Sequence, residues 1–202
     1  MDTPAAPPAT FKTPEQLARR HARWTYADLA LLPETHDRIE LIDGDLVLSP
    51  SPHATRHQRT VMNLASLMRA WTRAKRYGLV FIAPVDVVLT DRRVVQPDVC
   101  MLRQDRLGLV GRAIEGAPDV VVQVLSPSNA HFDRTVKVRL YEDEGVLECW
   151  LVDPDARTVE VLVLDEVHGY RKHAAGGQGD TVASAVMAGF SVDVSAVFED
   201  VR

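Results

Sequence analysis

The stretch Val120-Val121-Val122-Gln123-Val124-Leu125 decides the fold of this 202-residue chain. Such a continuous apolar run, bounded on both sides by proline-containing segments, is typical of a central strand that is covered on both faces. Side chains alternate along a strand, so Val121, Gln123 and Leu125 share one face. Gln123 is the polar exception in this run, and a buried amide without partners costs about 1–3 kcal/mol. Either a local hydrogen-bond network or a hydrated metal ion would satisfy it.

Two neighbouring segments carry further polar groups toward this strand. One is a predicted strand from Val94 to Leu102 that contains Gln96-Pro97-Asp98. Because proline cannot donate to a strand ladder, we expect this strand at an edge or a bulge, where Asp98 can reach an open site. The other is a predicted helix from Asp133 to Glu144, in which Asp133, Lys137 and Tyr141 recur every four residues and therefore share a face.

The remaining pattern predicts an alternation of helices and short strands. An Asp43-Gly44 pair between two apolar runs predicts a hairpin over Arg38–Leu48, which places Glu40 on a strand. Apolar residues at helical spacing predict a helix from about His57 to Tyr77. Other expected helices begin at Thr13 and at Thr25, and other expected strands cover Leu79–Ala83, Val85–Leu89, Leu147–Val152 and Thr158–Leu164, with further sheet-edge strands in Thr181–Phe198. This order predicts an α/β (α+β) fold with a mixed central sheet flanked by helices.

Composition limits the classes of function. The hydrophobic fraction of 46% suits one domain, expected over residues 13–202 after a flexible tail of residues 1–12. Two isolated cysteines in apolar runs predict buried thiols in a reducing compartment, and the lack of a signal segment or a long apolar run predicts a cytoplasmic protein with no membrane contact. A formal net charge of -5 does not attract a polyanion, so DNA would need a local basic patch. Arginines close to the polar segments could form such a groove: Arg56, Arg59, Arg92, Arg93, Arg134 and Arg139.

Four runs of sequence carry a resemblance to a known family: IELIDGDLVLSPSPHATRHQR, FIAPVDVVLTDRRVVQPDV, GAPDVVVQVLSPSNAHFDRTVKVRLY and CWLVDPDARTVEVL. The chain resembles the Uma-two family of endonucleases, a branch of the PD-(D/E)XK restriction-endonuclease-like superfamily, from about Thr25 to Tyr170. The resemblance maps the superfamily aspartate onto Asp98 and its second acidic residue onto Gln123. Leu125 stands where the superfamily lysine is usual, and Lys137 on the following helix matches the lysine of this family. Glu40 matches an acidic residue of the first element.

The resemblance implies a metal-dependent DNA endonuclease with a restriction-endonuclease-like core. Asp98, Glu40 and Gln123 would hold Mg²⁺ or Mn²⁺, which polarises the phosphate and activates a water molecule. Lys137 would orient that water or stabilise the transition state, with Tyr141 beside it. The amide of Gln123 keeps an oxygen but removes one negative charge, and hard cations are held mainly by charged oxygens.

Structural explanations compete with each of these roles. Glu40 could be a solvated strand residue, Asp98 a turn residue and Lys137 one end of a helix salt bridge. His57 fits a packed, hydrogen-bonded histidine better than a ligand, and Asp86 could support the site from behind. The alternative function is therefore a nuclease-fold protein with a weakened metal site that binds nucleic acid or another protein. A third hypothesis is a structural role as a homodimer joined through sheet edges.

Overall fold

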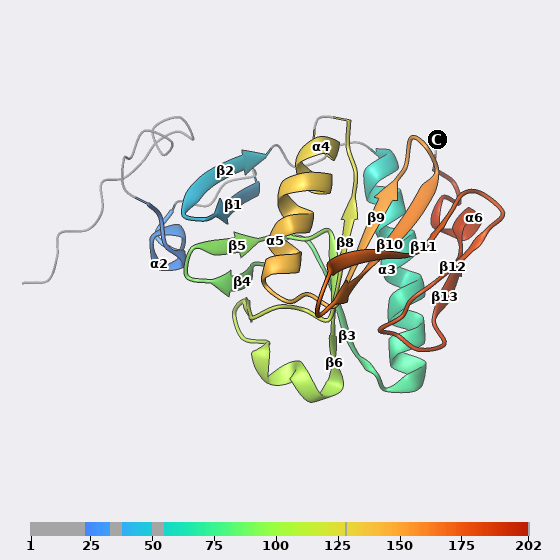
Figure 1. Ribbon diagram of the computed structural model, residues 1–202, viewed down its shortest axis with the longest axis horizontal. Coiled ribbons are helices and arrows are strands. Elements are labelled where there is room, and N and C mark those ends of the chain that lie inside the picture. The colour runs from blue at the N-terminus through green and yellow to red at the C-terminus, as the bar shows by residue number, and fades with distance from the viewer. Residues whose placement is uncertain (1–22, 33–37, 50–54, 128, 202) are drawn as a thin grey trace, which may run out of the picture. The chain divides into compact units, whose positions relative to one another are not determined.

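The computed structural model describes residues 23–32, 38–49, 55–127 and 129–201, and these form two compact units (Figure 1). The first unit takes the described residues before position 52 together with Val88–Val95, and the second takes those of 52–87 and all from Gln96 onward. The expected tail of residues 1–12 and the expected helix at Thr13 lie outside the described residues. A single domain over 13–202 stays a prediction.

The first unit is built on the predicted hairpin. Strands β1 (Arg38–Ile42) and β2 (Asp45–Ser49) pair antiparallel, and both turn residues have positive φ, 53° at Asp43 and 87° at Gly44. Positive φ at both central positions matches the twist of a two-residue hairpin, which is why Asp-Gly is favoured there. The prediction of this hairpin, with Glu40 on a strand, is confirmed.

The rest of the first unit packs on this hairpin. The short helix α2 (Tyr26–Leu29) begins at Thr25, whose hydroxyl accepts a hydrogen bond from the Asp28 amide in a reciprocal capping box. Strands β4 (Val87–Thr90) and β5 (Arg93–Val95) belong to the same sheet, whose strand order begins β2-β1-β5-β4. An apolar cluster holds these elements together: Trp24, Ile39, Leu41 and Val94.

The second unit contains a six-stranded mixed sheet in the order β11-β10-β9-β8-β6-β3. Only the pair β8 and β9 is parallel, and the other neighbours are antiparallel. All five residues of β8 are buried, so the predicted central strand is confirmed. The strands span Gly78–Ile82 (β3), Val99–Arg103 (β6), Val120–Val124 (β8), Glu148–Asp153 (β9), Thr158–Asp165 (β10) and Gly169–Gly176 (β11).

Helices cover both faces of this sheet (Figure 1). On one face, α3 (Thr55–Lys75) buries Val61, Leu64 and Met68 against the even-numbered valines of β8. On the other face lies one helical stretch made of α4 (Ala130–Phe132), a π-helical turn η2 (Asp133–Lys137) and α5 (Val138–Asp143). The expected mixed α/β layering is confirmed, and Gln123 lies on the face covered by the second stretch because it alternates with the valines that meet α3.

The expected strand from Val94 to Leu102 is two strands. Its first part is β5 in the first unit, and its second part is β6 in the second unit. Pro97 has no N–H to donate, so the chain leaves one sheet before it and enters the other after it. Strand β6 lies between β8 and β3, so the expectation of an edge position for Asp98 is wrong: Pro97 precedes the ladder and does not interrupt it.

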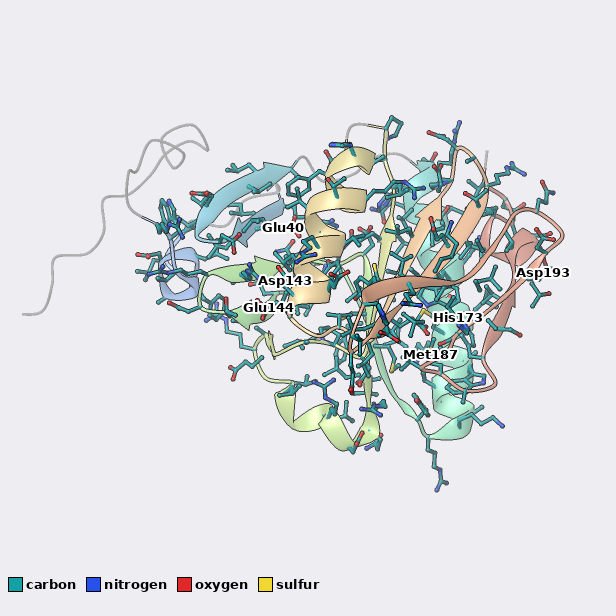
Figure 2. All side chains as sticks on the ribbon, viewed as in Figure 1. Glu40, Asp143, Glu144, His173, Met187 and Asp193 are labelled. Carbon is teal, nitrogen blue, oxygen red and sulfur yellow. The ribbon has the colours of Figure 1, made fainter. Side chains whose placement is uncertain are left out.

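The C-terminal segment also differs from the expectation. Strands β12 (Thr181–Ala183) and β13 (Ser191–Asp193) pair with each other in a separate two-stranded sheet and do not extend the edge of the large sheet. Met187 and Phe190, between them, are buried in the cluster that also contains the α3 face (Figure 2 labels Met187). The segment is therefore a lid on the apolar core, and burial of apolar surface stabilises it there.

Three short elements complete the second unit. The 3₁₀ helix η1 (Gln104–Leu109) follows β6, and strand β7 (Ile114–Glu115) follows η1. Helix α6 (Val194–Val197) follows β13. None of the helices in the described ranges combines the length and the apolar character that a bilayer crossing requires.

Candidate functional site

Asp98 directly precedes β6, and its carboxylate is buried. Its Oδ2 accepts a hydrogen bond of 2.8 Å from the backbone N–H of Val124 on β8. Strand β8 is the immediate neighbour of β6, with Val99 opposite Val122, so the chain direction brings Asp98 beside the end of β8. This bond fixes the carboxylate one residue away from Gln123.

Gln123 is satisfied by a specific partner. Its side-chain amide donates a 2.6 Å hydrogen bond to the hydroxyl of Tyr141 on α5, and both side chains are buried. Of the two expected ways to satisfy Gln123, a hydrogen-bond partner is present, and a metal ion stays a prediction. The remaining amide oxygen is the atom through which this residue could reach a cation, since an amide carbonyl has two lone pairs.

Lys137 and Asp133 are buried together on the same helical stretch. The Lys137 Nζ lies 3.6 Å from Asp133 Oδ1, and the lysine side chain is 3% exposed. Between them the helix widens: the Val138 N–H donates to the carbonyl of Asp133, five residues earlier. Such π-helical turns insert a residue and often occur at functional sites, because they turn side chains that a regular helix would place elsewhere. An exposed salt bridge is excluded as the explanation of this lysine.

Lys137 is one turn before Tyr141, so the helical stretch delivers both toward the β8 face that carries Gln123. In the second unit, Asp98, Gln123 and Tyr141 thus form a connected set through β8, and Lys137 is buried on the same covering helix. Glu40 belongs to the first unit, where it is fully buried on β1 (Figure 2). Its burial excludes a solvated strand residue.

His57 has a closer relation to Asp98 than the sequence suggested. Its Nε2 lies 3.5 Å from Asp98 Oδ2, and both side chains are buried. Its Nδ1 is buried and finds no hydrogen-bond partner among the described residues. A histidine in the first helical turn, on the buried face but among polar neighbours, is the signal that could have indicated this. Buried polar atoms are normally bonded, so this ring nitrogen calls for an explanation.

Comparison with known proteins identifies the family and the fold. The sequence matches the Uma2 family, described as "Putative restriction endonuclease", over residues 25–195. The chain belongs to the Uma2 family. Its fold is shared with the crystal structure of "a putative nuclease belonging to DUF820" from Anabaena variabilis, with a TM-score of 0.73 at 20% identity over 87% of this chain and 97% of that chain. No curated protein matches the sequence.

The resemblance to Uma2 stated from the sequence is thus confirmed, as is the fold class. The Uma2 match covers both strands β6 and β8 and the helical stretch that carries Lys137. The roles of Asp98, Gln123 and Lys137 remain predictions.

The oxygen atoms of this Uma2 site fit a hard divalent cation in kind. Asp98 offers a carboxylate and Gln123 an amide oxygen, which are the ligands that Mg²⁺ and Mn²⁺ prefer. An imidazole such as that of His57 is a better ligand for Mn²⁺ than for Mg²⁺. Within the described ranges, however, no three or more His, Cys, Asp or Glu residues are grouped to hold a metal. The second unit alone therefore supplies little negative charge for one.

Two other buried acidic residues of the second unit already have structural hydrogen-bond partners. Asp119 accepts hydrogen bonds from the side chains of Arg103 and Arg106, at 2.8 and 3.0 Å. Glu148 accepts from the Trp150 indole and from a cluster of donors in the C-terminal lid, Ser184, Ala185 and Val186, at 2.6 to 3.0 Å. Saturated carboxylates of this kind are poor candidates for a cation.

The two cysteines are buried and free, as predicted. Burial raises the pKa of the Cys100 thiol to about 12 and also raises that of Cys149. A thiol acts as a nucleophile only as the thiolate, so the raised pKa disfavours such a role for both cysteines.

The arginines expected to line a DNA groove are largely engaged in ion pairs. Arg134 approaches Glu160 at 3.3 Å, and Arg139 approaches Asp143 at 3.0 Å. Arg56 pairs with Asp155. In the first unit, Arg93 lies 2.6 Å from Asp43. A phosphate would have to compete with these carboxylates.

Proposed function

We propose that this protein is a metal-dependent endonuclease that hydrolyses phosphodiester bonds in DNA. The observation that carries the proposal is the buried Asp98 carboxylate, bonded to the β8 backbone one residue from Gln123. A buried carboxylate and a buried lysine on elements that meet at one strand are expensive to maintain without a role, because each charge loses its hydration.

Each residue has a proposed task. Asp98 would hold Mg²⁺ or Mn²⁺ together with the Gln123 amide oxygen, and Tyr141 would keep that amide in place. Glu40 is proposed as a further metal ligand on the strength of the family resemblance. Lys137, kept near Asp133, would stabilise the negative charge that develops on the phosphate or orient the attacking water. The bound cation would polarise the phosphate and lower the pKa of that water.

Plasmid cleavage with Mg²⁺ or Mn²⁺ tests this function. Asp98→Asn should reduce the cleavage rate more than about 100-fold, because it removes the charged metal ligand while keeping the shape of the side chain. Asp105→Asn, an exposed aspartate on η1, is the matched control and should cleave like the wild type. Wild-type protein that neither binds either metal by calorimetry nor cuts plasmid would remove the basis of the proposal.

One observation favours the second candidate, a nuclease-fold protein without catalysis. The described residues group no three acidic, histidine or cysteine side chains around Asp98, and the Gln123 amide is already bonded to Tyr141. Such a protein would bind DNA with no metal requirement. Retained DNA binding with cleavage absent in both metals would support it.

A further inference from the structure

Helix α3 carries basic residues but no acidic residue. None of the residues from Thr55 to Lys75 is acidic, although the whole chain has 28 acidic residues against 23 lysines and arginines. The basic residues of the helix and its C-terminal end are Arg56, Arg59, Arg69, Arg73, Lys75 and Arg76. In a net acidic protein, this segregation of charge needs a reason.

Most of this charge lies in one exposed stripe. The stripe members are spaced three or four residues apart and are all exposed: Arg59, Met62, Ser66, Arg69, Arg73 and Arg76. Such spacing places them along one side of the helix. Several of them line a pocket together with Val61 and Ala65 of the buried face, so the stripe runs beside that face. With a rise of 1.5 Å per residue, Arg59 and Arg73 are about 21 Å apart, a span that several phosphates of a strand can follow.

The stripe borders a groove between α3 and the edge strand β3. Two adjoining pockets of ≈ 640 and ≈ 550 Å³ share Arg69 and Val80 in their walls, and none of the described residues that line them is acidic. We call the two pockets together the α3–β3 groove. Its floor is apolar and open, with Met62 51% and Ile82 55% exposed.

The arginines of the groove are available for an anion. Arg69, Arg73 and Arg76 form no ion pair with any residue that the structure describes, in contrast to Arg134 and Arg139 on the opposite side of the sheet. Arg59 has only a distant and exposed contact, 3.8 Å from Asp200.

Arg76 is in addition held in a left-handed backbone conformation, with φ 51°. Tyr77 N–H donates to the carbonyl of Thr72 across this residue, the pattern of a helix end at which glycine is usual. A side chain here has a backbone cost that glycine avoids. Arginine at this position therefore makes the end of the helix less stable than glycine would.

We propose that the α3–β3 groove binds a single strand of nucleic acid. The phosphates would contact the arginine stripe, and the sugars and unpaired bases would cover the apolar floor at Met62, Val80 and Ile82. The inference deepens the proposed endonuclease function, on which it rests for the role of the bound strand. Thr55, at one end of the groove, also lines a pocket of ≈ 340 Å³ that reaches His57, so the strand would lead to the candidate site.

The apolar floor decides between a single strand and a duplex. A duplex keeps its bases in the stack and presents mainly sugar and phosphate to a protein surface, which would leave Met62 and Ile82 uncovered. An unpaired strand can turn its bases toward such a floor.

A second copy of the chain fits less well. Strand β3 is an edge strand, but a two-fold pair formed through this groove would use the same patch on both copies, and that patch carries Arg69 and Arg73. Like charges brought together oppose association.

The test is fluorescence anisotropy with a labelled 20-nucleotide single-stranded DNA, in chelator so that no cleavage occurs. The double variant Arg69→Gln/Arg73→Gln should bind at least tenfold more weakly, and the slope of log affinity against log salt should fall by about 1.4, the value for two lost phosphate contacts on a single strand. The control Arg112→Gln/Arg171→Gln removes the same charge from two exposed positions, one between η1 and β7 and one on the far edge strand β11, and should stay within twofold of the wild type. Equal melting temperatures would show that both variants fold.

Three outcomes would overturn the inference. The first is a double variant that binds like the wild type or no worse than the control. The second is a duplex of the same length that binds more tightly than the single strand. The third is a dimer in sedimentation that Met62→Ser/Ile82→Ser dissociates, since this would assign the groove to a second copy.

The experiment also separates this inference from the proposed function. Binding that depends on Arg69 and Arg73, together with no cleavage in Mg²⁺ or Mn²⁺, would keep the groove and refute the endonuclease. Metal-dependent cleavage together with DNA binding that does not depend on Arg69 and Arg73 would keep the endonuclease and refute the groove.

Discussion

Replacing Gln123 by glutamate places a carboxylate at a position that is 1% exposed and has the Tyr141 hydroxyl 2.6 Å away. Without metal, burial of an ion costs several kcal/mol even after relaxation, and one hydrogen bond to a charged group returns about 1.5–3 kcal/mol. We therefore expect Gln123→Glu to lower the free energy of unfolding by about 2 kcal/mol at neutral pH. For a protein of this length, that lowers Tm by roughly 4–8 °C.

The pH dependence of this loss has a definite sign. Burial raises the pKa of the introduced carboxyl above its unfolded value of about 4.3, so the folded state binds more protons than the unfolded state. The penalty should be absent below about pH 4 and grow as the pH rises toward the folded pKa. Gln178→Glu, at an exposed position, is the matched control and should show neither effect.

Magnesium should reverse the penalty if Gln123 faces a cation. An anionic oxygen in place of the amide should tighten Mg²⁺ binding about tenfold or more, and each tenfold gain stabilises the loaded protein by about 1.4 kcal/mol. Calorimetric titration with Mg²⁺ and melting curves over a range of Mg²⁺ concentrations measure both quantities. A variant that melts lower at every concentration, with unchanged affinity, would refute the metal-site reasoning and leave Gln123 as a structural partner of Tyr141.

Three further predictions concern stability and exposure. Glu148→Gln should lower the free energy of unfolding in urea by about 3 kcal/mol, because an amide cannot accept from every donor that the carboxylate now satisfies; a loss below about 1 kcal/mol would contradict this. Arg76→Gly should raise the free energy of unfolding by about 1 kcal/mol and weaken the binding of single-stranded DNA. A variant that is less stable and binds single-stranded DNA as tightly as the wild type would contradict both the backbone strain at Arg76 and the role of the groove. Burial raises the pKa of the Cys100 thiol to about 12, so this thiol should react with a thiol reagent only on unfolding. The native state should lose stability as the pH rises from roughly 8.5, where the unfolded thiol ionises. Rapid labelling of the native protein would disprove the burial of this thiol.

Local features of the sequence determined much of the architecture. The Asp43-Gly44 pair is sufficient for the hairpin, since few residues accept positive φ at both turn positions. The valine run around Gln123 could belong only to a central strand, and the apolar spacing after His57 only to a helix. Period and turn chemistry are properties of neighbouring residues, so these elements could be read directly. The Uma2 resemblance followed from the same runs.

Tertiary structure alone decided how these elements meet. Pro97 marks a break between two sheets, but the sequence around it reads as one strand, because pairing partners far along the chain determine where a strand ends. The bond from Val124 to Asp98, the contact of that carboxylate with His57 and the burial of Lys137 at a π-helical turn all join residues distant in sequence. The basic residues of α3 can be seen in the sequence. Only the packing of α3 against β3 shows that its arginines line an apolar groove. Spacing along a chain specifies which side chains share a face, and the long-range packing of sheets and helices specifies what that face meets.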